Sequence, residues 1–212
     1  MKYYLDITLL PDDGADLAFL WYKVYQQIHI GLVDNKVAEN NSAIALSIPN
    51  YGAKSFPLGN KIRLFAEDKN QLEVFNVPSW LNRLTDYVHI KSIQRVPDNI
   101  FEYAYFKRVA QKGKKRRQDT LIKKAEYQST KFNIPYDSCL KTLQEKSTLI
   151  DSELPFISVQ SLSTDRTLSA TNKTVFPLFI TMKKVSKPQS GLYTCYGLSR
   201  NIAGKQVTIP WF

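Results

Sequence analysis

Residues 3–28 read YYLDITLLPDDGADLAFLWYKVYQQI, and this stretch decides the fold of the N-terminal part of the chain. Its first eight residues alternate well enough between apolar and polar for a strand, and Pro-Asp-Asp-Gly at 11–14 stops that strand. A helix is predicted next, because apolar residues recur at the spacing of one helical face and form a single stripe: Leu17, Leu20, Trp21, Val24 and Ile28.

The same alternation of elements continues to Pro97. Three further strands are predicted, at 43–48, 61–66 and 87–96. Between the last two, Asp68 caps a helix that Pro78 interrupts and that continues over 80–84. The order β-α-β-β-α-β is that of the ferredoxin-like arrangement, also called split βαβ. Residues 1–97 are therefore predicted to form a ferredoxin-like domain, which by itself assigns no function.

Beyond Pro97 the sequence predicts a smaller α+β domain, residues 98–212, so the fold class of the chain is α+β. It should contain a short strand at 101–106, a basic helix at 114–127 after Gly113, and a second helix at 136–145 after Asn133-Ile134-Pro135. Paired strands are predicted at 156–160 and 175–182, joined by a long polar loop. Residues 193–199 return to a strand and a glycine turn.

Positive charge is concentrated in one segment. The 212 residues carry a net charge of +10, and residues 107–124 contain nine Lys or Arg against the single acid Asp119. A run of charges is most often a solvated helix face. Arg116 and Lys123 lie seven residues apart, as do Arg117 and Lys124, so each pair shares a helix face where like charges repel. A polyanionic partner is the better interpretation, although charge alone does not separate RNA from DNA or from acidic lipid surfaces.

Other composition features exclude several classes of protein. Two cysteines are too few for a disulfide framework, and the two cysteines and two histidines do not have zinc-site spacing. No apolar run approaches the roughly 20 residues that span a bilayer. A hydrophobic fraction of 43% is enough to fill a core. We therefore expect a cytoplasmic protein that needs no metal or other cofactor and has no membrane partner.

Few side chains could carry chemistry. The sequence contains no nucleophile elbow, P-loop, paired-carboxylate motif or metal cluster. His29 lies on the flank of the apolar helical stripe, where the residues alone favour a satisfied histidine at the core edge over a general acid or base. His89, within a predicted strand, is interpreted as structural. Cleavage of RNA through its own 2′-hydroxyl would require only such a histidine, a hydroxyl and positive charge.

Short motifs in the same order along nearly the whole chain resemble the type I-F CRISPR repeat-RNA endoribonucleases. The resemblance is strongest at the C-terminus, in Tyr193-Thr194-Cys195-Tyr196-Gly197-Leu198-Ser199 and Ile209-Pro210-Trp211-Phe212. It extends to Tyr4-Leu5-Asp6-Ile7, Ile28-His29-Ile30-Gly31-Leu32, Leu58-Gly59, Leu154-Pro155-Phe156, Ser161 with Ser163-Thr164, and Phe176 with Leu178-Phe179-Ile180. Each match is short, but the set is specific.

The resemblance implies an activity and its residues. Such enzymes bind the hairpin repeat of CRISPR precursor RNA, cut at the 3′ base of the stem without metal, leave 5′-hydroxyl and 2′,3′-cyclic phosphate ends, and stay bound to the mature guide RNA. His29 matches the catalytic histidine, Ser161 the serine that holds the attacking nucleotide, and Tyr196 the tyrosine that orients the histidine. A non-catalytic subunit that caps the guide RNA in a surveillance complex is the alternative.

The resemblance also implies an RNA-binding set. Ser163 and Thr164 match residues beside the scissile nucleotide, and Phe176 matches an aromatic that stacks on the foot of the stem. Arg108 matches an arginine that reads this stem, and a glutamine contact would come from Gln111. The remaining predicted contacts belong to the basic segment: Lys112, Lys114, Lys115, Arg116, Arg117, Lys123 and Lys124. The implied partners are the precursor and mature RNA hairpin and other subunits of a type I-F surveillance complex.

Overall fold

The structure is a computed structural model that describes residues 1–110, 114–148, 154–161, 175–200 and 206–212, with the side chains of 114–117 and 146–148 left out. The chain forms two compact units, one of residues 1–109 with 155–212 and one of residues 110–154. The predicted domain boundary at residue 97 lies inside the larger unit. The division into domains 1–97 and 98–212 stays a prediction.

The first sheet of the larger unit has the strand order β3-β4-β1-β5, in which β3 spans Ala45–Ser47, β4 Lys61–Ala66, β1 Tyr3–Leu9 and β5 Val88–Ile90. The short strand β6, Gln94–Arg95, also pairs with β1. Every pairing is antiparallel, with Leu5 opposite Leu64 and Ile7 opposite Ile90. This is the ferredoxin-like order, and the α+β class is confirmed.

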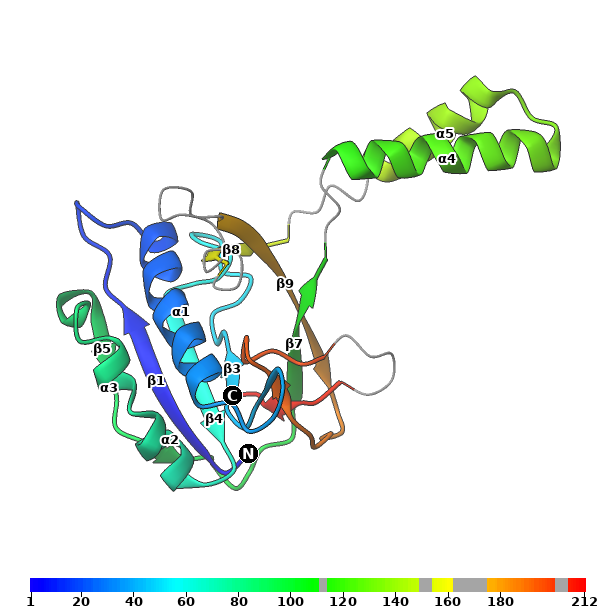
Figure 1. The fold of residues 1–212 in the computed structure, drawn as a ribbon. Coiled ribbons are helices and arrows are strands. Elements are labelled where there is room, and N and C mark those ends of the chain that lie inside the picture. The colour runs from blue at the N-terminus through cyan, green and yellow to red at the C-terminus, as the bar shows by residue number, and fades with distance from the viewer. Residues whose placement is uncertain (111–113, 149–153, 162–174, 201–205) are drawn as a thin grey trace. The chain divides into compact units, whose positions relative to one another are not determined.

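Helix α1, Leu17–Asp34, lies against one face of this sheet (Figure 1). It begins at Asp16, whose side chain accepts a hydrogen bond from the Phe19 N–H. Four residues of the predicted apolar stripe are buried: Leu20, Trp21, Val24 and Ile28. The Trp21 indole donates to the Gly59 carbonyl at 2.7 Å. The stripe fixes the rotation of the helix, so the flank that carries His29 faces the C-terminal part of the unit.

Two predicted elements of this half differ in the structure. The helix does not continue over 80–84: Asn76, in the left-handed conformation with φ 48°, ends α2, Lys69–Phe75, and the separate turn α3, Val77–Trp80, starts there with Pro78. A 3₁₀ turn at Thr85–Tyr87 follows. The strand predicted at 87–96 is broken into β5 and β6, and only the middle of the strand predicted at 43–48 pairs as β3.

The second sheet has the order β11-β7-β9-β8 and is also antiparallel, with β11 at Ile209–Pro210, β7 at Tyr103–Val109, β9 at Val175–Val185 and β8 at Phe156–Gln160. The predicted pairing of 156–160 with the strand from 175 is confirmed. One face of these strands contributes Phe106, Leu178 and Ile180 to the same hydrophobic core as the first sheet. A two-stranded sheet joins β2, Asn41–Ser42, to β10, Tyr193–Thr194.

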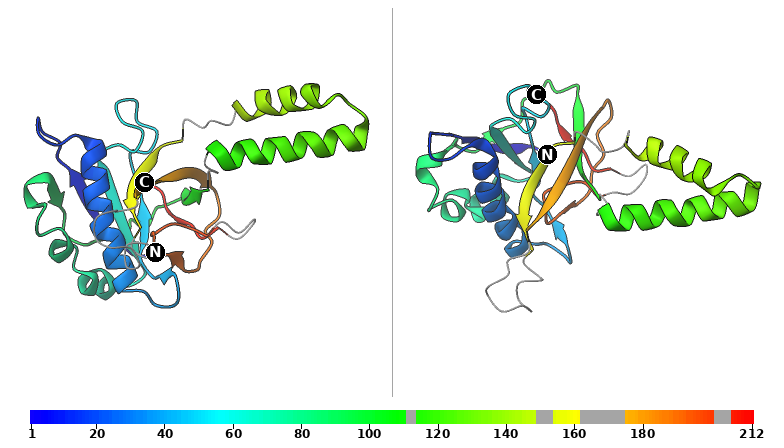
Figure 2. Two further views of the ribbon diagram at one scale, coloured as in Figure 1. Left: turned by 45° about the horizontal axis from the view of Figure 1, so that its top comes forward. Right: turned by 90° about the horizontal axis from the view of Figure 1, so that it is seen from above.

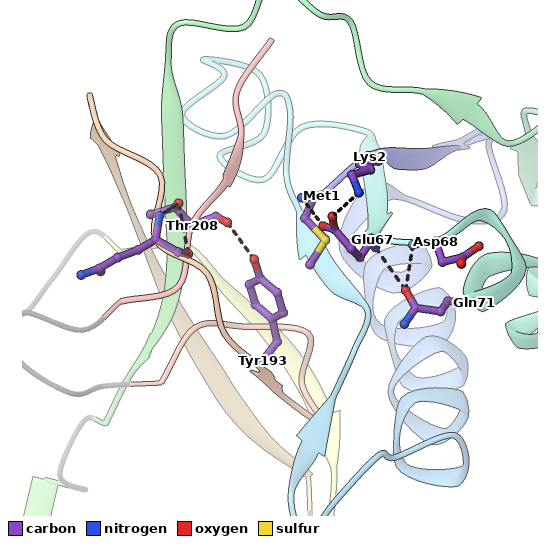
Figure 3. Close-up of polar contacts among 8 residues, drawn as sticks. Met1, Lys2, Glu67, Asp68, Gln71, Tyr193 and Thr208 are labelled. Atoms are coloured by element: carbon purple, nitrogen blue, oxygen red, sulfur yellow. Dashed lines mark hydrogen bonds and ion pairs between the residues drawn. The ribbon is translucent and has the colours of Figure 1, made fainter.

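Polar contacts hold the edges of this core (Figure 3). The Glu67 carboxylate forms ion pairs with the Met1 amino group at 2.8 Å and the Lys2 ammonium at 3.1 Å. These cations hold the pKa of the Glu67 carboxyl below its usual value. On the C-terminal side, the buried Tyr193 hydroxyl donates to the Thr208 carbonyl at 2.8 Å. Burial raises the pKa of Tyr193, so its hydroxyl remains a donor and ties β10 to the segment before β11.

The smaller unit is a helical hairpin of α4, Lys114–Phe132, and α5, Tyr136–Thr148, which lie side by side in both views of Figure 2. Ala125 and Cys139 are buried between the two helices. Asn133, with φ 54°, ends α4 just before Pro135, as the sequence predicts. The basic helix is thus confirmed and extends five residues beyond its predicted end.

Candidate functional site

A tight turn after β10 brings the predicted site residue Tyr196 to α1. The Gly197 N–H donates to the Thr194 carbonyl, and the Gly197 carbonyl accepts from Leu46 N–H on β3, both at 2.8 Å. Gly197 has φ 71°, and a Cβ there would lie 2.7 Å from Leu46 Cβ. Only glycine combines this conformation with such close packing. The turn therefore fixes Cys195 and Tyr196 against the helix.

His29 is held on both sides by this turn. Its Nδ1 lies 2.9 Å from the Cys195 carbonyl oxygen, and its ring stacks on that of Tyr196 with centroids 4.4 Å apart and planes within 7°. Because a carbonyl oxygen only accepts hydrogen bonds, Nδ1 carries the proton. In the neutral imidazole, Nε2 is then the unprotonated nitrogen. The arrangement fixes both the ring plane and the tautomer.

Burial shifts the titration of His29. Only 6% of the residue is exposed. Burial lowers the pKa of the imidazole from its ordinary value of 6.5, and the hydrogen bond to the Cys195 carbonyl opposes that effect only in part. At neutral pH the ring is therefore uncharged, with a lone pair on Nε2 that can accept a proton.

Two residues on the same flank of α1 were not predicted as site residues. The Tyr25 hydroxyl donates to the Tyr196 carbonyl at 3.0 Å, and burial holds the pKa of Tyr25 well above its usual value. The Gln26 amide oxygen accepts from the Gln160 N–H at 2.8 Å. They lie four and three residues before His29, and this helical spacing is the signal that could have found them.

Arg108 and Phe176 lie beside the stacked rings. The Arg108 guanidinium carbon is 5.4 Å from the centre of the Phe176 ring and 5.9 Å from that of Tyr196. Both distances are those of a cation–π contact. Arg108 is on β7 and Phe176 on β9, so the second sheet and the turn jointly present an arginine and an aromatic ring next to His29. The structure brings these four predicted residues together.

Ser161 follows β8 directly. The preceding residue, Gln160, is hydrogen-bonded through its main chain to Gln26 of α1, so the chain enters Ser161 next to the helix that carries His29. Four other predicted RNA contacts lie outside the described residues: Ser163, Thr164, Gln111 and Lys112.

The remaining predicted contacts belong to the separate helical unit. Lys123 and Lys124 are exposed on α4. The backbone of α4 includes Lys114, Lys115, Arg116 and Arg117, whose side chains are outside the described part. Helical spacing puts Arg116 on the same helix face as Lys123, and Arg117 on the same face as Lys124.

Three further observations concern the described residues. His89 lies exposed on β5, away from the residues that surround His29. No group of three His, Cys, Asp or Glu side chains gathers where it could hold a metal ion, within the part of the chain that the structure describes. None of the described helices combines the length and apolarity that crossing a membrane requires.

Comparison with protein families gives a match over residues 4–212 to the family described as CRISPR-associated protein (Cas_Csy4). The chain belongs to this family. Its members are endoribonucleases that process CRISPR RNA, and the predicted recognition of a CRISPR repeat-RNA processing protein is confirmed. Binding and processing of CRISPR repeat RNA are thus supported for this chain.

Two further comparisons add little to this assignment. Among solved structures, a similar chain is described as "An RAMP protein binding different RNA substrates"; it is 10% identical, with 99% of this chain and 100% of that chain covered and a TM-score of 0.36. A search of curated proteins finds no match.

Proposed function

We propose that this member of the family cleaves the hairpin repeat of CRISPR precursor RNA at the 3′ base of its stem, without metal, through the 2′-hydroxyl of the substrate. The products are a 2′,3′-cyclic phosphate and a 5′-hydroxyl. Family membership supports repeat-RNA processing. The cleavage chemistry is supported by the geometry around His29.

One observation carries the proposal: Nδ1 of His29 is bonded to the Cys195 carbonyl, and the ring is uncharged at neutral pH. Nε2 is then a base with a fixed direction. An imidazole in this state accepts a proton, so its role in the first step is that of a general base. This choice between base and acid was left open by the sequence.

The reaction needs no nucleophile from the protein. Nε2 of His29 takes the proton of the 2′-hydroxyl, the 2′-oxygen attacks the adjacent phosphorus, and the bond from phosphorus to the 5′-oxygen breaks. The departing 5′-oxygen takes up a proton, either from water or from the imidazolium formed in the first step. Ser161 would hold the nucleotide that carries the 2′-hydroxyl, and Tyr196 would keep the imidazole ring in plane through the stack seen here.

RNA recognition is assigned to two regions. Phe176 would cap the foot of the stem by stacking, with Arg108 beside it and Ser163 and Thr164 near the scissile nucleotide. The A-form major groove is too deep and narrow for ordinary reading by side chains, so α4 would contact phosphates rather than bases. Its phosphate contacts would come from six basic residues: Lys114, Lys115, Arg116, Arg117, Lys123 and Lys124. Before the helix, Lys112 would contact a phosphate and Gln111 a base.

Analysis of the product ends tests the proposal. A hairpin repeat incubated with the protein in EDTA should yield a 2′,3′-cyclic phosphate and a 5′-hydroxyl. The same RNA with one 2′-deoxy nucleotide just upstream of the cut should bind equally well and stay intact. Cleavage of the deoxy RNA, or a strict need for added metal, would instead indicate hydrolysis by activated water.

A second candidate function rests on the burial of His29. A histidine that is 6% exposed and bonded to a main-chain carbonyl also fits a purely structural role. The protein would then cap the 3′ hairpin of a mature guide RNA as a non-catalytic subunit of a type I-F surveillance complex. Single-turnover incubation with repeat RNA distinguishes the two functions, because a cap binds the hairpin without cutting it.

A further inference from the structure

The second sheet has a face turned away from the core, and its composition is unusual. Along β7 and β9, the residues that alternate with the buried ones point away from the core. They form three cross-strand pairs: Tyr105 with Lys183, Lys107 with Thr181 and Val109 with Phe179. Phe156 of β8 lies opposite Phe179, and their ring centres are 5.4 Å apart. We call the surface of Tyr105, Lys107, Phe156, Phe179 and Lys183 the outer face.

The outer face is partly exposed and carries one sign of charge; Tyr105, Lys107 and Phe179 are half-buried. Phe156 is 51% exposed, and Lys183 is exposed. None of the residues on this side of β7, β8 and β9 is acidic in the described part of the chain. Aromatic rings interleaved with lysines on an exposed sheet surface bind single-stranded nucleic acid, because bases stack on the rings while ammonium groups neutralise phosphates.

The outer face is continuous with the site. On β7, Arg108 points to the side of His29 and Tyr196, whereas its neighbours Lys107 and Val109 point to the outer face. On β9, Phe176 is on the side of the site and Phe179 is on the outer face. The two surfaces therefore meet at the same end of these strands. A chain that leaves the site past Arg108 and Phe176 reaches Phe179 and Phe156 by crossing that end.

We propose that the outer face binds the single-stranded RNA that lies downstream of the cleaved phosphate. This inference rests on the proposed function, because cleavage at the 3′ base of the stem places the first downstream nucleotide at His29. The hairpin supplies the specificity in this arrangement. The outer face adds affinity that is tolerant of sequence and holds the uncut precursor in place.

The test compares hairpins with and without a downstream extension of about ten nucleotides, each with a 2′-deoxy nucleotide at the cut. The wild-type protein should bind the extended hairpin at least about fivefold more tightly, the lower end for one stacked base. Phe156→Ala and Phe179→Ala should remove that gain while binding of the minimal hairpin is unchanged. Phe101→Ala, at a phenylalanine that is 82% exposed outside the outer face, is the matched control and should keep the gain.

Lys183→Glu tests the same surface without removing an aromatic contact. It should also abolish the gain from the extension, and its exposed position makes loss of folding a poor explanation. An equal gain in wild type and all three outer-face variants would overturn the proposal, as would a gain from an upstream extension only. Absence of any gain in the wild type would also overturn it and favour a protein partner for this surface. Cleavage of the all-ribose extended hairpin at saturating protein, measured in parallel, reports on the proposed function independently.

Discussion

The surroundings of His29 and the basic helix α4 differ in how their side chains are held. His29 is buried, bonded to a main-chain carbonyl and stacked on Tyr196, so its position depends on the packing of α1 against the turn at 193–199. Lys123 and Lys124 are exposed on a helix that packs against α5. The position of the imidazole therefore depends on packing, whereas the character of α4 depends on its charge.

This difference predicts which quantity each region controls. A fixed imidazole changes the rate of a bond-breaking step but adds little to affinity, because it makes few contacts with the RNA. Exposed lysines change affinity and its salt dependence through released counterions, but they do not alter the chemical step. Substitution of His29 should therefore change the cleavage rate and not the affinity, and substitutions in α4 should change the affinity and not the rate.

The largest effect is expected for His29→Ala. Cleavage of bound hairpin should slow by roughly 10²–10⁴-fold, the usual contribution of general acid–base catalysis, with RNA affinity little changed. Single-turnover rates at saturating protein measure the effect, and a gel-shift titration measures affinity. His89→Ala, at the exposed histidine of β5, is the control and should cleave normally. Near-normal cleavage by the His29 variant would remove the difference between the two regions and favour the non-catalytic cap.

The pH dependence sharpens the role of His29. A base must be uncharged, and burial lowers the pKa of this imidazole below 6.5. The cleavage rate, measured at protein concentrations below the Kd, should therefore stay constant above about pH 6.5. It should fall about tenfold per pH unit only below the lowered pKa. A general acid would give the reverse, with rates that fall as the pH rises through that pKa. The His29→Ala variant should show neither limb.

Phe176→Ala should act on affinity without involving charge. Base–aromatic stacking is worth about 1–3 kcal/mol, which corresponds to binding weaker by about 5- to 150-fold. The slope of log K against log salt should be unaltered, since stacking releases no counterions. Titrations of the hairpin at four salt concentrations measure both quantities. A changed slope would mean that Arg108, which contacts this ring, loses a phosphate when the ring is removed.

Much of this arrangement could be predicted from the sequence, because it depends on local patterns. The apolar spacing from Leu17 to Ile28 fixes the rotation of the first helix, and so places His29 on its flank. The strand pair 156–160 and 175–185 and the capping of the second helix by Asp68 follow equally local rules. The resemblance in the motifs at 193–199 predicted a site that joins the two ends of the chain.

What the sequence does not reveal depends on contacts between distant residues. The carbonyl of Cys195 holds His29, but any residue has a carbonyl, so no side-chain pattern marks this role. Asn76 ends α2 in a left-handed conformation, but the apolar residues after it continue the helical pattern, so the sequence predicts a longer helix. Tyr25 and Gln26 become site residues only because α1 packs against a turn more than 160 residues later and against the end of β8.

The lysine pair of α4 tests the second half of the comparison. Replacing Lys123 and Lys124 by alanine removes up to two phosphate contacts, which should flatten the slope of log K against log salt by about 1.4 to 1.8. The cleavage rate at saturating protein should barely change. Lys69→Ala with Lys187→Ala, two exposed lysines of the larger unit, is the charge-matched control and should leave the slope unaltered. An unchanged slope in the α4 variant would move the RNA away from this helix and support a merely solvated charged face.

The smallest effect is expected for Tyr25→Phe, which removes only the hydroxyl that donates to the Tyr196 carbonyl. A lost hydrogen bond of this kind lowers the free energy of unfolding by about 1 kcal/mol, or roughly 2–4 °C in Tm for a chain of this size. The ring of Tyr25 remains, and His29 keeps its bond to Cys195, so the cleavage rate should stay within about threefold of wild type. Thermal unfolding and single-turnover cleavage measure the two effects on one preparation. Tyr22→Phe on the same helix is the matched control for loss of a tyrosine hydroxyl away from the turn. If Tyr25→Phe instead slowed cleavage as severely as His29→Ala, the position of the Tyr196 main chain would control the imidazole, and the geometry of the site would depend on a hydroxyl one helical turn away.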